Sequence, residues 1–190
     1  QPYGITSYKK SDGVYQIFIT DSYEYDTPKN DRIVSFEFLY EKDSFSIASS
    51  TMFGEETLYQ VESIMVDSSN KTLLVADENK EHYKIAVLDL NSGDNISAKL
   101  QDFVFTADPE GIALVQTSNI TGYWIVTEQS ETDNKFHLFD RESFEYMHTL
   151  YLKDVSNTDG IATAYMHGHW YLYAVDNDRR VAAFKLPEIH

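Results

Sequence analysis

The feature that most constrains the fold is a short motif that occurs four times along the chain. In each copy a small residue is followed by Ile; the small residues are Gly4, Ser63, Gly111 and Gly160. The residue just before each of them is Tyr3, Glu62, Glu110 or Asp159. A period of roughly 50–60 residues is typical of a repeat architecture, in which each repeat is one structural unit.

The segments after each motif have the composition of β-strands. They are short, rich in β-branched and aromatic residues, and bounded by Gly, Asn, Asp and Ser. In some of them, such as residues 34–38, apolar and polar residues alternate. The expected strands after the motifs are 14–20, 32–38, 45–48, 72–76, 83–90, 96–105, 123–127, 135–140, 145–152, 170–175 and 180–186.

About four strands in roughly 50 residues is the size of one blade of a β-propeller. We therefore predict an all-β chain built of four-stranded antiparallel blades, with blades at about 1–57, 58–106, 107–155 and 156–190, the last lacking a final strand. Residues 1–190 would form a single propeller domain or the larger C-terminal part of one, which we expect to be six-bladed. A closed four-bladed ring is the alternative. The chain begins at Gln1 without an initiator Met, so we expect a processed chain or a piece of a longer one.

Charge and composition exclude several classes of function. The formal net charge is −16, from 31 acidic and 15 basic side chains. A basic patch for nucleic acid or an anionic membrane surface is therefore not expected, and no apolar run approaches the ~20 residues of a membrane helix. The chain has no Cys, which excludes disulfides and thiolate metal sites.

The repeated acids predict a single crowded rim. In a propeller the innermost strands surround the axis, so Tyr3, Glu62, Glu110 and Asp159 should lie on one face. The next strand of each blade returns to that face. We therefore expect a second set of polar side chains where these strands end: Asp21, Glu78, Glu128 or Gln129, and Asp176. Asp108 adds a carboxylate beside Glu110. Clustered carboxylates need neutralisation, and oxygen ligands without Cys favour Ca²⁺ or, less strongly, Mg²⁺. The alternative is that these acids cap turns by accepting backbone N–H groups.

At these same residues the chain resembles the β-propeller phytases, calcium-dependent enzymes that remove phosphate from inositol hexakisphosphate (phytate). The matching segments, in chain order, are Gln1-Pro2-Tyr3-Gly4, the pair Glu62 and Glu78, Asp108-Pro109-Glu110-Gly111 with Gln129 downstream, and Ser156-Asn157-Thr158-Asp159-Gly160-Ile161. The likeness runs through nearly the whole chain.

The resemblance implies metal-assisted hydrolysis of a phosphate monoester, with phytate or a similar small phosphorylated molecule as substrate. The residues it implies for Ca²⁺ are Glu62, Glu78, Asp108, Glu110 and Asp159. Glu62, Glu110 and Asp159 are the expected catalytic residues, and Gln129, Arg179 and Arg180 the expected substrate contacts. The family also implies a secreted, periplasmic or cell-surface location.

Three departures from the family pattern keep a second interpretation open. Asn157 replaces an Asp of the family, Phe36 replaces a phosphate-contacting Tyr, and residues 49–56 contain no basic side chain. The alternative is a non-catalytic propeller that binds a protein or glycan, with or without a stabilising calcium ion.

Overall fold

The computed structural model describes residues 1–190 except 26, 28, 55–57, 97–98 and 189–190. It confirms the predicted all-β class. Within the described residues, fourteen strands form four antiparallel sheets in chain order, two of four strands and two of three. The strands of the first sheet are β1 (Pro2–Ser11), β2 (Val14–Asp21), β3 (Ile33–Glu41) and β4 (Ser44–Met52). Those of the second sheet are β5 (Val61–Asp67), β6 (Thr72–Asp77) and β7 (Lys84–Asp89).

The third and fourth sheets repeat the same order. The third sheet contains β8 (Pro109–Gln116), β9 (Gly122–Glu128), β10 (Lys135–Asp140) and β11 (Tyr146–Tyr151). The fourth sheet contains β12 (Ile161–Met166), β13 (His169–Asp176) and β14 (Arg180–Lys185). In every sheet neighbouring strands are consecutive in sequence, which is the meander of a propeller blade.

One predicted strand is wrong. Residues 96–105 do not extend the second sheet; their described part holds a short 3-10 helix, Lys99–Asp102. Within this segment Leu100 and Phe105 are buried in the core between the second and third sheets, and Ile96 and Phe103 pack against it. The apolar residues of this segment have strand propensity, but they fill the space between two sheets because burial in a core outweighs local propensity.

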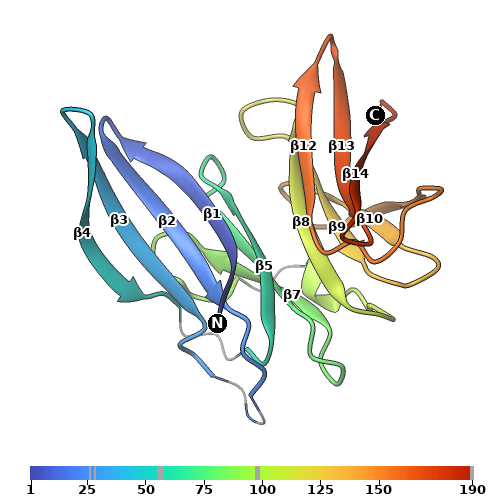
Figure 1. Cartoon of the computed structure of the whole chain (residues 1–190), viewed down its shortest axis with the longest axis horizontal. Coiled ribbons are helices and arrows are strands. Elements are labelled where there is room, and N and C mark those ends of the chain that lie inside the picture. The colour runs from blue at the N-terminus through green and yellow to red at the C-terminus, as the bar shows by residue number, and fades with distance from the viewer. Residues whose placement is uncertain (26, 28, 55–57, 97–98, 189–190) are drawn as a thin grey trace.

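The four sheets pack side by side through their first strands. Strand β1 contacts β5, β5 contacts β8, and β8 contacts β12. Each interface between neighbouring sheets has its own buried core, with Phe18 and Leu73 in the first, Trp124 in the second and Leu172 in the third. In Figure 1 the first and fourth sheets lie at opposite ends of the row, and β1 and β12 run in the same upward direction. The inner strands therefore begin at one common edge. No helix in the described part of the chain is long and apolar enough to cross a membrane.

Candidate active site at the start of the inner strands

A β-bulge occurs at the repeated motif in the first three sheets. The pairing of the inner strand with its neighbour shifts register between Pro2 and Ile5, between Val61 and Ile64, and between Pro109 and Ile112. A bulge changes the direction of the side chains that it contains. The side chain before the small residue of each motif therefore does not follow the regular alternation of side chains along its strand.

The small residue of the motif allows neighbouring inner strands to approach closely. A Cβ atom on Gly4 would overlap the carbonyl oxygen of Glu62 in the next sheet. A Cβ atom on Gly111 would lie 2.9 Å from the backbone nitrogen of Ile161 and 3.3 Å from the carbonyl oxygen of Asp159. The hydroxyl of Thr20 adds a link at the first contact, since it accepts from Gly4 N and donates to the Glu62 carbonyl, both at 2.8 Å. Close backbone packing thus sets the spacing of the acids.

The structure brings the motif side chains of all four sheets within electrostatic range of one another. Glu62 and Glu110 are 7% and 5% exposed. Burial, followed by the neighbouring Glu78, raises the pKa of Glu62 to about 8 and that of Glu110 to about 11. The pKa of Tyr3 is raised by burial and then by Glu62, Glu110 and Asp159. Glu62, Glu78, Glu110 and Asp159, with Tyr3 and Gln129, are called the acidic rim below.

Glu78 and Gln129 connect the acidic rim to the second strands. The carboxylate of Glu78 raises the pKa of both Glu62 and Glu110, and it accepts a hydrogen bond from the side-chain amide of Gln60. The side-chain amide of Gln129 donates to Asp159 Oδ1. Each residue immediately follows the last residue of β6 or β9, and its backbone N–H bonds the chain entering the inner strand, at Gln60 O (2.9 Å) and Asp108 O (2.8 Å). They are therefore fixed in equivalent positions.

Asp108 lies next to a tyrosine. Burial, followed by the neighbouring Asp108 carboxylate, raises the pKa of Tyr83 to about 12. Glu78 and Glu128 raise it further. No direct interaction of Asp108 with Glu62, Glu110 or Asp159 is found among the described residues.

The last residue of each second strand caps a loop. The repeat predicts Asp21, Asp176 and either Glu128 or Gln129 at the common rim; Asp21, Glu128 and Asp176 instead bind backbone N–H groups. Glu128 accepts a hydrogen bond from the backbone N–H of Thr106 at 3.0 Å, and Asp176 accepts one from Ser156 at the same distance. Asp77 accepts from the backbone N–H groups of Tyr59 and Gln60 at 2.9 and 3.0 Å, and Asp21 accepts from that of Tyr23 at 3.3 Å. Carboxylates that satisfy backbone donors at a loop are the turn-capping alternative. It holds for these four residues.

One acid at the rim was missed by the sequence analysis. Asp178 raises the pKa of Asp159, second only to the effect of burial. It lies in the β13–β14 turn, with φ of 53°. The sequence signal for it is the second acid of Asp176-Asn177-Asp178. At Asn157, which departs from the family pattern, the side-chain amide donates to Asn177 Oδ1 at 3.2 Å.

The two predicted arginines are exposed, Arg179 at the end of the β13–β14 turn and Arg180 at the start of β14. Arg180 binds Asp176 Oδ2 at 2.6 Å and donates from Nη2 to the carbonyl of Asp154 at 2.9 Å. The backbone N–H of Arg179 donates to Asp176 O at 3.1 Å. Neither guanidinium is joined to the acidic rim in the described part of the chain, so their role as substrate contacts stays a prediction.

The chemistry of the rim fits a hard cation, although its geometry does not form a ready ligand shell. Among the described residues, no group of three or more acidic or histidine side chains is arranged to hold a metal ion. Glu62 Oε2 and Glu110 Oε2 are nevertheless buried without a hydrogen-bond partner. Buried carboxylate oxygens need a proton or a cation. The donors are oxygens, as Ca²⁺ prefers.

The fold and this arrangement of acids define a β-propeller protein. The model of the Phytase family matches residues 19–168, and the chain belongs to that family. The suspected resemblance is thereby confirmed. The comparison with curated protein sequences gives no match.

Comparison with solved structures shows the same fold in proteins of low sequence identity. A thermostable family-43 glycoside hydrolase is 13% identical with a TM-score of 0.56, over 93% of this chain and 63% of that one. For the exo-beta-1,3-galactanase of Phanerochaete chrysosporium the identity is 11% and the TM-score 0.58, over 97% and 47%. A chain of a nidogen/laminin complex is 15% identical with a TM-score of 0.55, over 89% and 70%. The chain thus spans less than two thirds of the two glycosidase chains.

Proposed function

We propose that the protein is a Ca²⁺-dependent phosphomonoester hydrolase acting on inositol phosphates. The observation that carries the proposal is the meeting of Glu62, Glu110 and Asp159 from three sheets, with an unpartnered buried oxygen on Glu62 and on Glu110. Membership of the Phytase family supports a phytase-like activity. The family also supports a location outside the cytoplasm.

The residues that would hold Ca²⁺ are Glu62, Glu78, Glu110 and Asp159, with Asp108 at the margin of the rim. Bound Ca²⁺ supplies positive charge that offsets the charge of phosphate oxygens and lowers the pKa of a coordinated water. In this chain Tyr3 lies next to Glu62, and the side-chain amide of Gln129 donates to Asp159. These two contacts orient the carboxylates, since a ligand held by an outer hydrogen bond is positioned for its metal.

A cavity beside the rim offers basic side chains for the substrate. It has a volume of about 530 Å³ and lies between the β6–β7 connection and residues 101–105. Lys80, His82 and Lys84 line it, as do the acids Glu81 and Asp102. Tyr83, whose pKa is raised by burial and by the neighbouring Asp108, also lines it. Asn79 orders the connection from β6 to β7. Its backbone carbonyl accepts from His82 N at 2.8 Å, and its side-chain oxygen accepts from Glu81 N at 3.1 Å. Lysines near a cation site are suited to a phosphorylated ligand.

We further propose that the four sheets are the larger part of a longer propeller. Large apolar side chains of the first sheet are open to solvent, with Ile5 65% and Phe45 66% exposed. In the fourth sheet Val181 is 62% exposed. Sheets that present apolar side chains in this way are typical of blades with a missing neighbour.

Calorimetric titration with Ca²⁺, run beside a phosphate-release assay on inositol hexakisphosphate, tests the function. We expect saturable binding, calcium-dependent release, and loss of both in Glu62→Gln and Glu110→Gln. Glu142→Gln, an exposed acid in the turn after β10, is the matched control and should behave as the parent. Binding without release would instead support the non-catalytic binding module. No binding would overturn the calcium site.

A further inference from the structure

A second cavity lies at the opposite end of the inner strands from the acidic rim. Its volume is about 260 Å³, and it lies between the third and fourth sheets. The β8–β9 turn contributes Thr117, and the β12–β13 hairpin contributes Tyr165, His169 and Trp170. Figure 1 shows these connections at the upper ends of β8 and β12, whereas both strands begin at the lower edge. The cavity is therefore separate from the proposed phosphatase site.

Aromatic rings form its walls. The rings of Tyr165 and Trp170 have centroids 5.5 Å apart and planes inclined by 56°. They are directly paired across β12 and β13, so both side chains project from the same face of the sheet. Tyr123 of β9 adds a third ring. Inclined rings around a small cavity present several aromatic faces to one ligand, unlike the single flat platform of a stacked pair.

Tyr123 contributes a buried polar group. Its side chain is only 4% exposed, yet its hydroxyl has no hydrogen-bond partner among the described residues. Burial alone raises the pKa of this hydroxyl to about 12, so it is a neutral phenol. Tyr123 lines the cavity, so its ring and its neutral hydroxyl are available to a ligand there.

The charge of the lining favours a cation. Glu188 is the carboxylate among the lining residues, and no described Lys or Arg lines this cavity or the adjoining one formed by Gln116, Thr117, Tyr165 and Trp170. The whole chain carries a net charge of −16, which attracts cations over longer distances. Aromatic faces bind organic cations, with Trp the strongest, and quaternary ammonium groups are bound in this way.

We propose that this cavity binds an alkylated ammonium group. The group sits among Tyr123, Tyr165 and Trp170, with Glu188 balancing its charge. The proposal does not depend on the phosphatase activity, since the two sites share no residue.

Titration with choline chloride tests the proposal, with Trp fluorescence and calorimetry as the readouts. Trp124 is fully buried in the core, so a change on titration reports mainly on Trp170. We expect saturable binding that weakens about threefold to tenfold in Tyr165→Ala, the loss expected for one cation–π contact. Tyr165 is 61% exposed, and its removal should leave the fold intact. Tyr151→Ala, on a strand and 65% exposed, is the matched control and should bind as the parent does.

Two further ligands refine the test. One separates the contribution of charge from that of shape, and the other distinguishes a free small-molecule cation from a cation on a protein side chain. The neutral isostere 3,3-dimethylbutanol should bind at least about threefold more weakly than choline; equal binding would overturn the proposal in favour of a plain apolar pocket. A trimethyl-lysine peptide carries the same head group, and tighter binding than choline would assign the cation to a protein partner. No saturable response to either cation, with thermal unfolding unchanged, would also overturn the proposal.

Discussion

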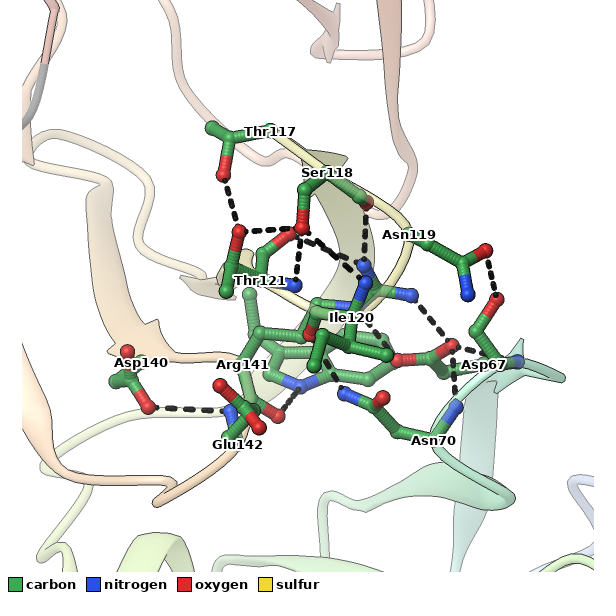
Figure 2. A network of polar contacts seen from close by, with 12 residues as sticks. Asp67, Asn70, Thr117, Ser118, Asn119, Ile120, Thr121, Asp140, Arg141 and Glu142 are labelled. Atoms are coloured by element: carbon green, nitrogen blue, oxygen red, sulfur yellow. Dashed lines mark hydrogen bonds and ion pairs between the residues drawn. The ribbon is translucent and has the colours of Figure 1, made fainter.

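Arg141 and Asp67 form a fully buried, two-point ion pair that joins the second and third sheets. Arg141 Nε lies 2.7 Å from Asp67 Oδ2, and Nη2 lies 2.7 Å from Oδ1, with both side chains 0% exposed. The remaining Nη1 donates to the carbonyls of Ser118 and Thr121, each at 3.1 Å. Figure 2 shows Arg141 between Asp67 and the 117–121 turn. The pair therefore ties the end of β5 to two connections of the third sheet.

Removing one partner of this pair should strongly destabilise the protein. We expect Asp67→Asn to lower the free energy of unfolding by about 3–5 kcal/mol, because an unpaired guanidinium would stay buried. Urea unfolding followed by circular dichroism measures it. The double variant Asp67→Leu/Arg141→Met should lose less than the sum of the two single changes. A loss below about 1 kcal/mol in Asp67→Asn would show that water reaches the arginine.

Close packing between inner strands should make two glycines intolerant of a methyl group. We expect Gly4→Ala and Gly111→Ala each to cost about 1–3 kcal/mol, because the new Cβ meets the backbone of the next sheet. The matched control is Gly160→Ala. Among the described residues, the neighbour of its new Cβ within 4 Å is Val175 Cγ2, at 3.7 Å, which is an ordinary van der Waals contact. This change should be neutral or slightly stabilising in this chain. In a longer propeller with a blade beside the fourth sheet, Gly160→Ala should become as costly as Gly111→Ala.

Glu128 should make stability depend on acid pH. Burial by itself would raise its pKa, but hydrogen bonds from His137, Lys135 and Thr106 outweigh burial and hold the pKa well below its usual range. Its contribution to stability is therefore present above the unfolded-state pKa of about 4.3 and is lost as the pH falls through the lower folded-state value.

The comparison of Glu128→Gln with the parent measures this contribution. The variant should be less stable by about 1–3 kcal/mol near neutral pH, and the gap should narrow steadily below about pH 4. Unfolding free energies between pH 2 and 7 give the curve. A gap that stays constant over this range would show that the charge of Glu128 is not the source of its effect.

Gln129 should act on calcium through Asp159. Its amide donates to Asp159, so Gln129→Leu removes the contact that orients this carboxylate while keeping similar volume. We expect about a tenfold loss of Ca²⁺ affinity, as for other outer hydrogen bonds at metal sites. Calorimetry measures the affinity, and thermal unfolding of the calcium-free protein is the control. Unchanged affinity would place Asp159 outside the ligand set.

Local sequence signals identified the blades where strand composition and turn residues agreed. They failed at 96–105, where Leu100 and Phe105 resemble strand residues but fill the core between two sheets. They also left two roles open for the acids that end the second strands. Asp77 and Asp176 accept backbone N–H groups, and the residues after β6 and β9, Glu78 and Gln129, face the rim. The choice depends on a one-residue difference in register, which composition does not specify.

By itself the sequence determined the repeat, the all-β class and the four motif positions at the start of the inner strands, which are Tyr3, Glu62, Glu110 and Asp159. These features follow from periodicity and from local strand propensity. Tertiary structure alone decided that Glu128 and Asp176 cap loops, that Asp178 joins Asp159, and that Arg141 reaches Asp67 across 74 residues of chain. Contacts of this kind form between sheets, where bulges, close glycine packing and burial act together. No local stretch of sequence encodes them.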